Sequence, residues 1–378
     1  MPALLPNIDP DGLLEYSVVF TDRSLNHMSA QFQRVMNEVS ATLKKVYNAQ
    51  AVALVPGGGT YAMEAVARQL AQNEKCLVIR NGFFSFRWSQ IIEMGGITPN
   101  VTVMKARQAN AGSQQPFAPA PIDEVVAKIA EEKPAVVFAP HVETASGMIL
   151  PNDYLKAVAG AVHAVGGLFV LDCIASGAIW VDMQATGVDV LISAPQKGWS
   201  GSPCCGIVMM NDAALAKVNA TSSNSFACDL KKWLQIMQAY ENGGHAYHAT
   251  MPTDSIKYFH DMMQLAEQAG FENLRARQTE LGQKVRALLA SKGLISVAAE
   301  GYQAPGVAVY YTSDDAIQNG KKFVEQGLQI AAGVPLQCDE PADYKTFRLG
   351  LFGIDKLNDV DGTVARFETA LNEVLAKG

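Results

Sequence analysis

Several features that define whole classes of protein are missing from the sequence. The six cysteines include no CxxC pair and lie mostly inside apolar runs, which argues against a zinc site and against disulfides. No apolar run reaches the roughly 18–20 residues of a membrane-spanning helix. The N-terminal residues lack the basic start and apolar stretch of a secretory signal. We therefore expect a cytoplasmic protein with no membrane partner and no bound metal.

The sequence also has fewer basic than acidic residues. The chain of 378 residues carries 30 lysines and arginines against 37 aspartates and glutamates, for a net charge of −7. This balance argues against a nucleic acid or an anionic membrane surface as the main partner. Hydrophobic residues make up 49% and charged residues 18%, so the chain has enough apolar side chains for a large buried core.

Short apolar runs alternate with helical patterns from residue 51 onward. Each run has four to six residues, and most precede a segment with helical periodicity. Such runs predict a largely parallel, doubly wound α/β sheet that is covered on both faces. The seven runs span residues 51–56, 76–80, 101–104, 135–140, 168–172, 188–193 and 206–210.

The pattern changes after residue 255. A long helical stretch over 256–290 is interrupted near Gly270. It is followed by short strands at 294–299 and 307–312 and by a helix over 315–326. Strands and helices in this proportion are typical of a small α+β domain.

We divide the chain into three parts on this basis. Residues 1–25 contain many turn formers and are interpreted as an N-terminal arm with a short strand. Residues 26–260 form the large α/β domain, and residues 261–378 form the smaller C-terminal domain.

Lys197 stands between the apolar run 188–193 and a loop of small residues, in the stretch ISAPQKGWSGSPCCG. Burying an ammonium group is costly, so a lysine at the rim of a core is unusual. The position suits an amine that is partly desolvated to attack a carbonyl, as in Schiff-base chemistry. A surface lysine in a turn is the alternative.

Two further features fit a phosphate-bearing ligand. The segment GGGT at 57–60 joins a strand to a helix, and glycines there let an anion approach the helix N-terminus. It matches neither GxGxxG nor the P-loop pattern, so neither a dinucleotide nor ATP is indicated; a tight turn is the alternative. Asp172 ends the buried strand 168–172, at the edge of the sheet where ligands bind. It either caps a helix or keeps the ring nitrogen of a pyridine cofactor protonated.

Polar groups also follow another strand and lie within a strand of the small domain. The segment HVETASG at 141–147 places hydroxyls and a carboxylate after the run 135–140. Arg348 lies within the apolar stretch FRLGLFG. A buried arginine aimed at a cleft is a fork for a carboxylate, and a structural ion pair is the alternative reading.

Seven segments in order give the chain a family resemblance. They are GGGT, NGFF, HVETASG, LDCIAS, SAPQK, AYHATMP and FRLGLFG. From about residue 30 to its end, the chain resembles the class V aminotransferases of the fold-type I superfamily, which depend on pyridoxal 5'-phosphate. It is most similar to the alanine–glyoxylate and serine–pyruvate aminotransferases. The resemblance implies a mostly parallel seven-stranded sheet between helices, with a smaller α+β domain. It also implies ping-pong transfer of an amino group from an alanine- or serine-like amino acid to glyoxylate or pyruvate.

The resemblance also implies roles for residues around the cofactor ring. Lys197 would join the cofactor as a Schiff base and, once released, move the proton during transfer. Asp172 would pair with the ring nitrogen, and Ile174 would pack beneath the ring. Phe84 would stack on the other face, and Thr144 would hydrogen-bond the phenolic oxygen.

The remaining implied roles concern the phosphate and the substrate. The phosphate would be held by Gly58, Gly59, Thr60 and Gln196. Tyr247 and Thr250, in AYHATMP, would reach the phosphate of the neighbouring subunit, which implies a homodimer. Arg348 would bind the α-carboxylate of the substrate.

The sequence departs from the family pattern in two places. Relatives usually carry a glycine- and proline-rich loop near the start, where this chain has EYSVVFTDRSLNH at 15–27. Tyr16 and Arg23 are therefore candidates for reading a more polar substrate side chain, with a structural role as the alternative. Phe84 stands where tryptophan is common.

Two other functions compete with transamination. A cysteine desulfurase-like carbon–sulfur lyase would use a mobile nucleophilic cysteine, and Cys338 lies ten positions before Arg348. Desulfurases usually have histidine directly before the lysine, whereas Gln196 favours an aminotransferase. A non-catalytic relative is the second alternative, and the joint presence of Lys197, Asp172 and Arg348 argues against it.

Overall fold

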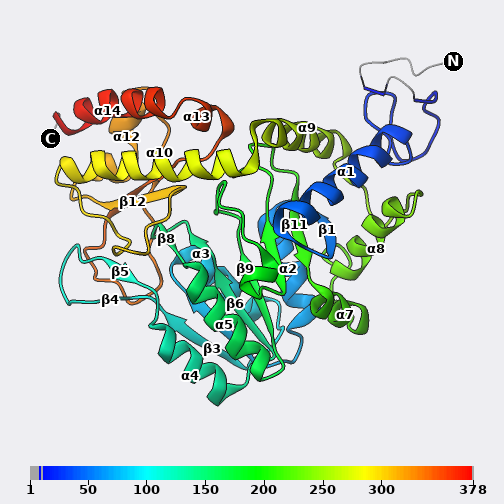
Figure 1. The fold of residues 1–378 in the computed structure, drawn as a ribbon, viewed down its shortest axis with the longest axis horizontal. Helices are drawn as coiled ribbons and strands as arrows, with labels where there is room; N and C mark the ends of the chain where they lie inside the picture. Colours follow the sequence, from blue (N-terminus) through cyan, green and yellow to red (C-terminus); the bar gives the residue numbers. More distant parts are fainter. Residues whose placement is uncertain (1–7, 10–11, 377–378) are drawn as a thin grey trace.

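A central seven-stranded sheet organises the molecule (Figure 1). The structure is a computed structural model that describes residues 8–9 and 12–376. The strand order is β1-β11-β10-β9-β6-β2-β3. The strands are β1 (Ala51–Pro56), β2 (Cys76–Arg80), β3 (Val101–Lys105), β6 (Val136–Pro140), β9 (Leu168–Asp172), β10 (Val190–Ser193) and β11 (Cys205–Met210).

The sheet is mostly parallel, as the sequence predicts. β10, β9, β6, β2 and β3 pair in parallel, whereas β11 runs antiparallel to both β1 and β10. Every residue of β2, β6, β10 and β11 is buried, which means that both faces of the sheet are covered. All seven predicted strands are confirmed, with bounds within two residues of the apolar runs.

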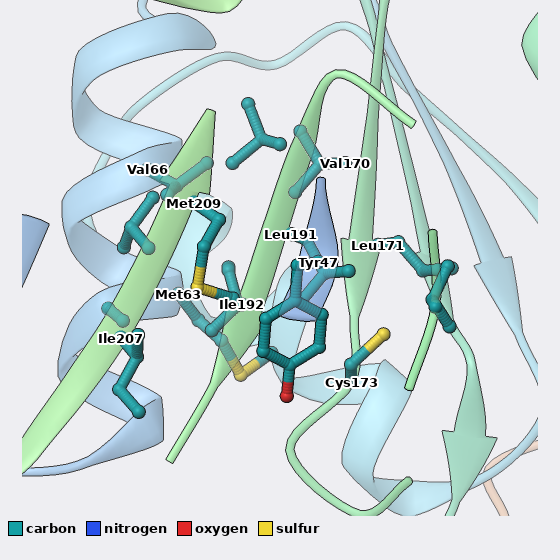
Figure 2. Close-up of a cluster of buried hydrophobic side chains, with 14 of the residues drawn as sticks. Tyr47, Met63, Val66, Val170, Leu171, Cys173, Leu191, Ile192, Ile207 and Met209 are labelled. Carbon is teal, nitrogen blue, oxygen red and sulfur yellow. The ribbon is translucent and has the colours of Figure 1, made fainter. Parts of the chain in front are cut away.

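Capping residues determine where α1 (Ala30–Tyr47), one of the helices that cover the sheet, begins and ends. The Ser29 side chain accepts a hydrogen bond from the Phe32 N–H, and Asn48 closes the helix in the left-handed conformation. Tyr47 from α1 and Met63 and Val66 from α2 pack on strand residues in one apolar cluster (Figure 2). The other helices of this part are α2 (Gly59–Leu70), α3 (Phe83–Met94), α4 (Ile122–Glu132), α5 (Asn152–Ala164), α6 (Met183–Thr186), α7 (Asp212–Ala220) and α8 (Leu230–Glu241).

The C-terminal part has its own small sheet. β12 (Val307–Tyr311), β14 (Thr346–Gly350) and β13 (Ala331–Ala332) pair antiparallel, with β14 in the centre. The long helical stretch is divided into α9 (Thr253–Ala269) and α10 (Phe271–Ser291) at Gly270, which has a φ of 84°. α10 packs against the final helix, α14 (Val360–Ala376), and α13 (Ile354–Asn358) precedes that helix.

Three details of the chain differ from the sequence predictions. The helix expected over 315–326 is two short helices, α11 (Asp315–Gln318) and α12 (Lys321–Val324), because Gly320 between them has a φ of 82°. Residues 294–299 form only isolated bridges instead of a strand. Within 12–25, the part of the arm that the structure describes continuously, turns and bends replace the expected strand.

Four two-residue strands complete the structure. β4 (Arg107–Gln108) pairs with β5 (Phe117–Ala118), and β7 (Val142–Glu143) pairs with β8 (Met148–Ile149). The β7–β8 hairpin follows directly on β6, at the carboxyl end of that central strand. It therefore lies at the edge of the sheet where the carboxyl ends of β9 and β10 also open.

Candidate active site

Asp172 lies at the carboxyl end of β9, in the middle of the sheet. Its side chain is 7% exposed, and Oδ1 accepts a hydrogen bond of 2.9 Å from the Ile174 N–H. Burial, with a smaller contribution from nearby Glu143, raises the pKa of this carboxyl group to about 7. The carboxylate is thus held in a place that favours a cationic partner.

Lys197 follows β10, the neighbouring strand, in a tight turn. The Ser200 N–H donates to the Lys197 carbonyl at 3.1 Å, with Ser200 in the left-handed conformation. Gly198 is required here, because a Cβ at that position would lie 2.1 Å from the Gly177 carbonyl oxygen. The turn fixes the backbone from which the Lys197 side chain extends.

The Lys197 amine lies in a cationic and partly apolar setting. Burial lowers its pKa, and Arg348 and Arg87 lower it further. Its Nζ lies 5.4 Å from the centre of the Phe352 ring, and no carboxylate of the described residues pairs with it. A larger share of the amine is therefore unprotonated at neutral pH than in an exposed lysine, as a nucleophile requires.

The glycine-rich turn lies at the start of α2. Gly58 is the N-cap and provides no side-chain cap, which leaves the first N–H groups of the helix available for an anion. A Cβ on Gly59 would lie 2.3 Å from Cδ1 of Ile174, so only glycine allows this contact. Ile174 therefore links the start of α2 to the end of β9, where Asp172 lies.

Phe84 lies in the first turn of α3, and Glu143 holds that turn in place. Glu143 is fully buried, and its two carboxylate oxygens accept hydrogen bonds from the N–H groups of Phe84, Ser85 and Ala145 at 2.9–3.1 Å. The Ser85 hydroxyl donates a fourth bond at 2.6 Å. Glu143 thereby connects α3 to the loop that carries Thr144. Its position in HVETASG indicated a carboxylate at this edge, but its hydrogen-bond partners could not be predicted from the sequence.

Two arginines lie close to the Phe84 ring. The guanidinium carbon of Arg348 is 5.4 Å from the ring centre, and that of Arg87 is 4.6 Å from it. Arg348 Nε donates to the Ala332 carbonyl at 2.7 Å, and burial lowers its pKa. Arg87 Nη1 donates to the Thr60 hydroxyl at 3.1 Å. Arg87 was missed by the sequence analysis because it matches no segment that indicated chemistry.

Three other residues that were predicted to bind the phosphate are Gln196 and, on the 243–250 loop, Tyr247 and Thr250. Oε1 of Gln196 is buried and has no hydrogen-bond partner among the described residues. The Tyr247 hydroxyl lies 3.0 Å from the Thr250 hydroxyl, and both residues are exposed on the loop between α8 and α9. This loop presents its two hydroxyls to the outside of the chain.

The two substrate candidates of the arm lie apart from this centre within the chain. Tyr16 is 90% exposed, and Arg23 is exposed with no side-chain hydrogen bond to the lysine loop. The described part of the arm lies beyond the start of α1, at the end of that helix away from the central sheet (Figure 1). Within one chain, these two residues therefore do not join the site.

The residues at the sheet edge fit a phosphorylated pyridine aldehyde. A buried carboxylate suits a pyridinium nitrogen, and a partly desolvated amine suits an aldehyde carbon. The contact between Gly59 and Ile174 leaves no room for a Cβ, and the start of α2 is open to an anion. Fold and site together define an enzyme of the fold-type I class, which uses pyridoxal 5'-phosphate.

Comparison with known proteins identifies the family. The family model described as Aminotransferase class-V matches residues 13–361, and the chain therefore belongs to the class-V aminotransferases. It is a transaminase, and its cofactor is pyridoxal phosphate.

Individual relatives are distant but cover most of the chain. The rat alanine–glyoxylate aminotransferase is 25% identical over 93% of this chain and 82% of its own length. The soluble hydrogenase small subunit of a Synechococcus species is also 25% identical, over 93% of this chain and 88% of its own. The solved structure of alanine–glyoxylate aminotransferase from Nostoc sp. superposes with a TM-score of 0.77 at 23% identity, covering 92% of this chain and 88% of that one.

Among the described residues, the helices are all too short or too polar to cross a membrane.

Proposed function

We propose that the protein transfers an amino group from an alanine- or serine-like amino acid to glyoxylate or pyruvate by a ping-pong mechanism. The observation that carries this proposal is the environment of Lys197, a half-buried amine beside two arginines with no carboxylate partner among the described residues. The name of the rat relative supports alanine and glyoxylate as substrates.

The bound cofactor supplies an aldehyde carbon and an electron-withdrawing ring. Asp172 keeps the ring nitrogen protonated, because a buried carboxylate with a raised pKa gains most from a cationic partner. Ile174 and Phe84 would pack on the two faces of the ring, and Thr144 would bind its phenolic oxygen. Phe84 keeps its backbone position through the bonds to Glu143.

Lys197 moves the proton that transfer requires. Its amine, held partly unprotonated by burial and by the neighbouring arginines, would take the proton from the α-carbon of the substrate onto Nζ and release it again as the transfer is completed. The turn fixed by Gly198 gives the amine a constant origin for both movements.

Arg348 binds the substrate carboxylate. Its Nε is occupied by the Ala332 carbonyl, which orients the guanidinium plane and leaves the two terminal nitrogens for a bidentate contact. Half-burial of this side chain makes the charge-assisted contact stronger than it would be in water.

The working unit in this proposal is a homodimer. Tyr247 and Thr250 are exposed and hydrogen-bonded to each other, so they are available to bind the phosphate in the partner's site together with that site's Gly58, Gly59, Thr60 and Gln196. Tyr16 and Arg23 would likewise read the substrate side chain from the arm. Light scattering on the purified protein tests this part, and a monomer with full activity would contradict it.

We also propose the division into an arm (1–25), a large domain (26–260) and a small domain (261–378), and a cytoplasmic location. Residues 1–7 and 10–11 of the arm lie outside the described residues. The boundary at residue 260 falls inside α9, whose His260 Nε2 lies 2.6 Å from Glu38 Oε2 of α1. Limited proteolysis that cuts near Gly270 and leaves α9 with the large fragment would move this boundary.

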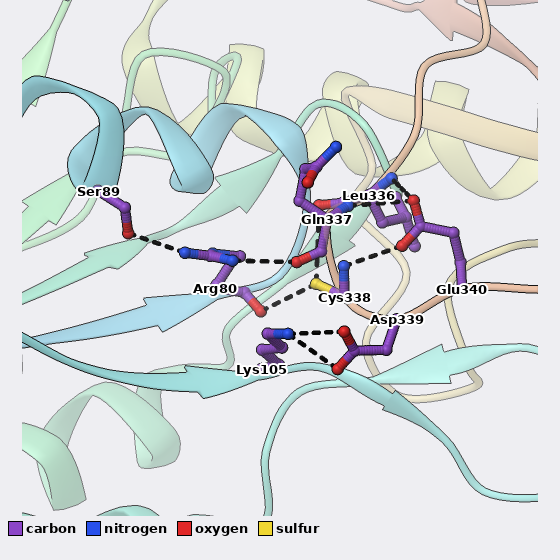
Figure 3. Close-up of polar contacts among 8 residues, drawn as sticks. All are labelled: Arg80, Ser89, Lys105, Leu336, Gln337, Cys338, Asp339 and Glu340. Carbon is purple, nitrogen blue, oxygen red and sulfur yellow. Dashed lines mark hydrogen bonds and ion pairs between the residues drawn. The ribbon is translucent and has the colours of Figure 1, made fainter. Parts of the chain in front are cut away.

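The geometry of Cys338 disfavours the lyase alternative. Its side chain is 4% exposed, and burial raises the pKa of the thiol to about 12, the reverse of an activated nucleophile. Figure 3 shows the surrounding contacts: the thiol donates to the Arg80 carbonyl at 3.4 Å, and Glu340 accepts bonds from the N–H groups of Leu336, Gln337 and Cys338. An ion pair between Lys105 and Asp339 fixes the same segment.

Initial-rate kinetics test the proposed reaction. With alanine or serine varied at several fixed concentrations of glyoxylate, double-reciprocal plots should be parallel, because the oxo acid formed from the amino donor leaves before glyoxylate binds. Sulfide release from cysteine should be absent, and the Cys338→Ala variant should transaminate like the wild type. Intersecting plots, or sulfide release that Cys338→Ala abolishes, would contradict the proposal.

A further inference from the structure

Arg87 extends from α3 toward the start of α2. Its Nη1 donates to the Thr60 hydroxyl at 3.1 Å, and its guanidinium carbon lies 4.6 Å from the centre of the Phe84 ring. Arg87 therefore touches one residue of the glycine-rich turn and the aromatic residue of the site at once. A cation over an aromatic face is held in a defined orientation.

Arg87 forms no ion pair with a carboxylate among residues 8–9 and 12–376. The ion pairs that arginine forms among the described residues involve Arg68, Arg107, Arg275 and Arg366, each with a glutamate or aspartate. Within the described part of the chain Arg87 makes no such pair, although the sequence has an excess of acidic residues.

Arg87 also adds to a local concentration of positive charge. It lowers the pKa of both Lys197 and Arg348, which shows that the three cations lie within electrostatic reach of one another. Two carboxylates lie within reach of this group, since Arg87 lowers the pKa of Asp172 and Glu143 raises that of Arg348. Glu143 already accepts four hydrogen bonds, and Asp172 is the proposed partner of the ring nitrogen. Three cations beside two engaged carboxylates are stabilised by a further anion.

The position of Arg87 indicates which anion this is. Its contact with Thr60 brings the guanidinium to the N-terminus of α2, where the helix dipole and free N–H groups already favour an anion. The other residues proposed to hold the cofactor phosphate are uncharged: Gly58, Gly59, Thr60 and Gln196, with Tyr247 and Thr250 from the second subunit. A phosphate monoester carries a charge of about −1.5 to −2 near neutral pH, which neutral donors alone balance poorly.

We infer that Arg87 is the cationic partner of the cofactor phosphate, with its guanidinium bridging the Thr60 hydroxyl and a phosphate oxygen. This inference rests on the proposed phosphate-binding role of the 57–60 turn. It assigns Arg87 to cofactor retention, while Arg348 binds the substrate carboxylate. It also gives the contact with Phe84 a second purpose, since that ring orients the guanidinium toward α2.

Cofactor affinity tests the inference without any measurement of turnover. The full-length enzyme, freed of cofactor, is titrated with pyridoxal phosphate and, separately, with pyridoxal, which has the same ring and aldehyde but no phosphate. Arg87→Met should raise the Kd for pyridoxal phosphate about ten- to a hundredfold, as expected for the loss of a hydrogen bond to a charged group. The Kd for pyridoxal should change less than about twofold, since the lost contact is to the phosphate.

Three further variants make the result specific. Arg87→Lys keeps the charge and should recover part of the affinity for pyridoxal phosphate. Arg68→Met, which removes an arginine of α2 that pairs with Glu64, should leave both Kd values unchanged. Thr60→Val should weaken the binding of pyridoxal phosphate but not the binding of pyridoxal. Thermal denaturation of each cofactor-free variant verifies that it is folded.

Several outcomes would overturn the inference. Equal weakening of both ligands by Arg87→Met would mean that Arg87 acts only through Phe84 and the fold. Unchanged cofactor affinity, with a raised KM for amino acids that carry a second acidic group, would make Arg87 a substrate-reading residue. If Thr60→Val weakens pyridoxal phosphate and Arg87→Met does not, the turn keeps its role and only the inference fails. If neither variant has an effect, the proposed phosphate site is wrong as well.

Discussion

Glu143 accepts four hydrogen bonds with its buried carboxylate. We therefore expect its substitution to lower the free energy of unfolding more than substitution of any other non-catalytic residue near the site. Three of its donors are backbone N–H groups, of Phe84, Ser85 and Ala145, and one is the Ser85 hydroxyl. Glu143→Ala removes every acceptor at once and leaves three N–H groups buried without partners. At about 1–3 kcal/mol for each unsatisfied buried donor, and allowing for partial relaxation, we expect a loss of about 3–5 kcal/mol in unfolding free energy.

Glu143→Gln separates the loss of charge from the loss of shape. The amide keeps one acceptor oxygen but turns an NH2 group toward donors that need an acceptor, so we expect a smaller loss of about 1–3 kcal/mol. Because Phe84 and Thr144 are attached to this carboxylate through the backbone, both variants should also bind pyridoxal phosphate more weakly.

Thermal and urea denaturation of the cofactor-free protein measure these losses. The Tm of Glu143→Ala should fall by about 4–6 °C for a chain of this length. Glu132→Ala, which removes a surface carboxylate paired with Lys75, is the matched control and should unfold like the wild type. Wild-type stability and wild-type cofactor affinity in Glu143→Ala would refute the reasoning.

Three further predictions concern charge. Arg348→Ala should raise the KM for the amino acid by about thirtyfold or more, because a charge-assisted carboxylate contact is worth about 2–5 kcal/mol, while cofactor affinity changes little; an unchanged KM would contradict this. Asp172→Asn should lower kcat strongly but raise the Tm of the cofactor-free protein at pH 8. The folded pKa of Asp172 lies above its unfolded value, so its buried charge destabilises the fold fully above pH 7, and equal Tm values at pH 8 would refute this account. Burial lowers the pKa of His141 to about 4. The unfolded protein therefore binds a proton at this histidine at a higher pH than the folded protein does, and stability falls as the pH drops from about 6.5 to 4. His141→Gln should flatten this part of a Tm-against-pH curve, and an unchanged slope would count against it.

Continuous apolar runs made the strands easy to locate from the sequence. A strand buried on both faces needs apolar residues throughout, and runs such as 76–80 and 168–172 match β2 and β9 at both ends. Lys197 and Asp172 could be placed at one edge because the carboxyl ends of parallel strands meet there. The antiparallel pairing of β11 with β1 and β10 could not be predicted, because hydrophobic periodicity does not encode the order or direction of strands in a sheet.

Contacts between distant segments account for what the sequence could not show. Glu143 acts on α3, 58 residues earlier at Ser85, and nothing in either segment alone indicates their pairing. Likewise, a role for Arg87 is indicated only by its hydrogen bond to Thr60 on another helix. Gly320 broke a predicted helix because its left-handed conformation depends on the surrounding turn.

The absorption spectrum of the purified enzyme tests the central claim most directly. The wild type, with pyridoxal phosphate bound, should show a visible band that bleaches when alanine or serine is added alone and returns with glyoxylate or pyruvate. Lys197→Ala should bind the cofactor without covalent attachment and should not turn over. Normal turnover by Lys197→Ala, or no cofactor band in the wild type after incubation with pyridoxal phosphate, would contradict the account.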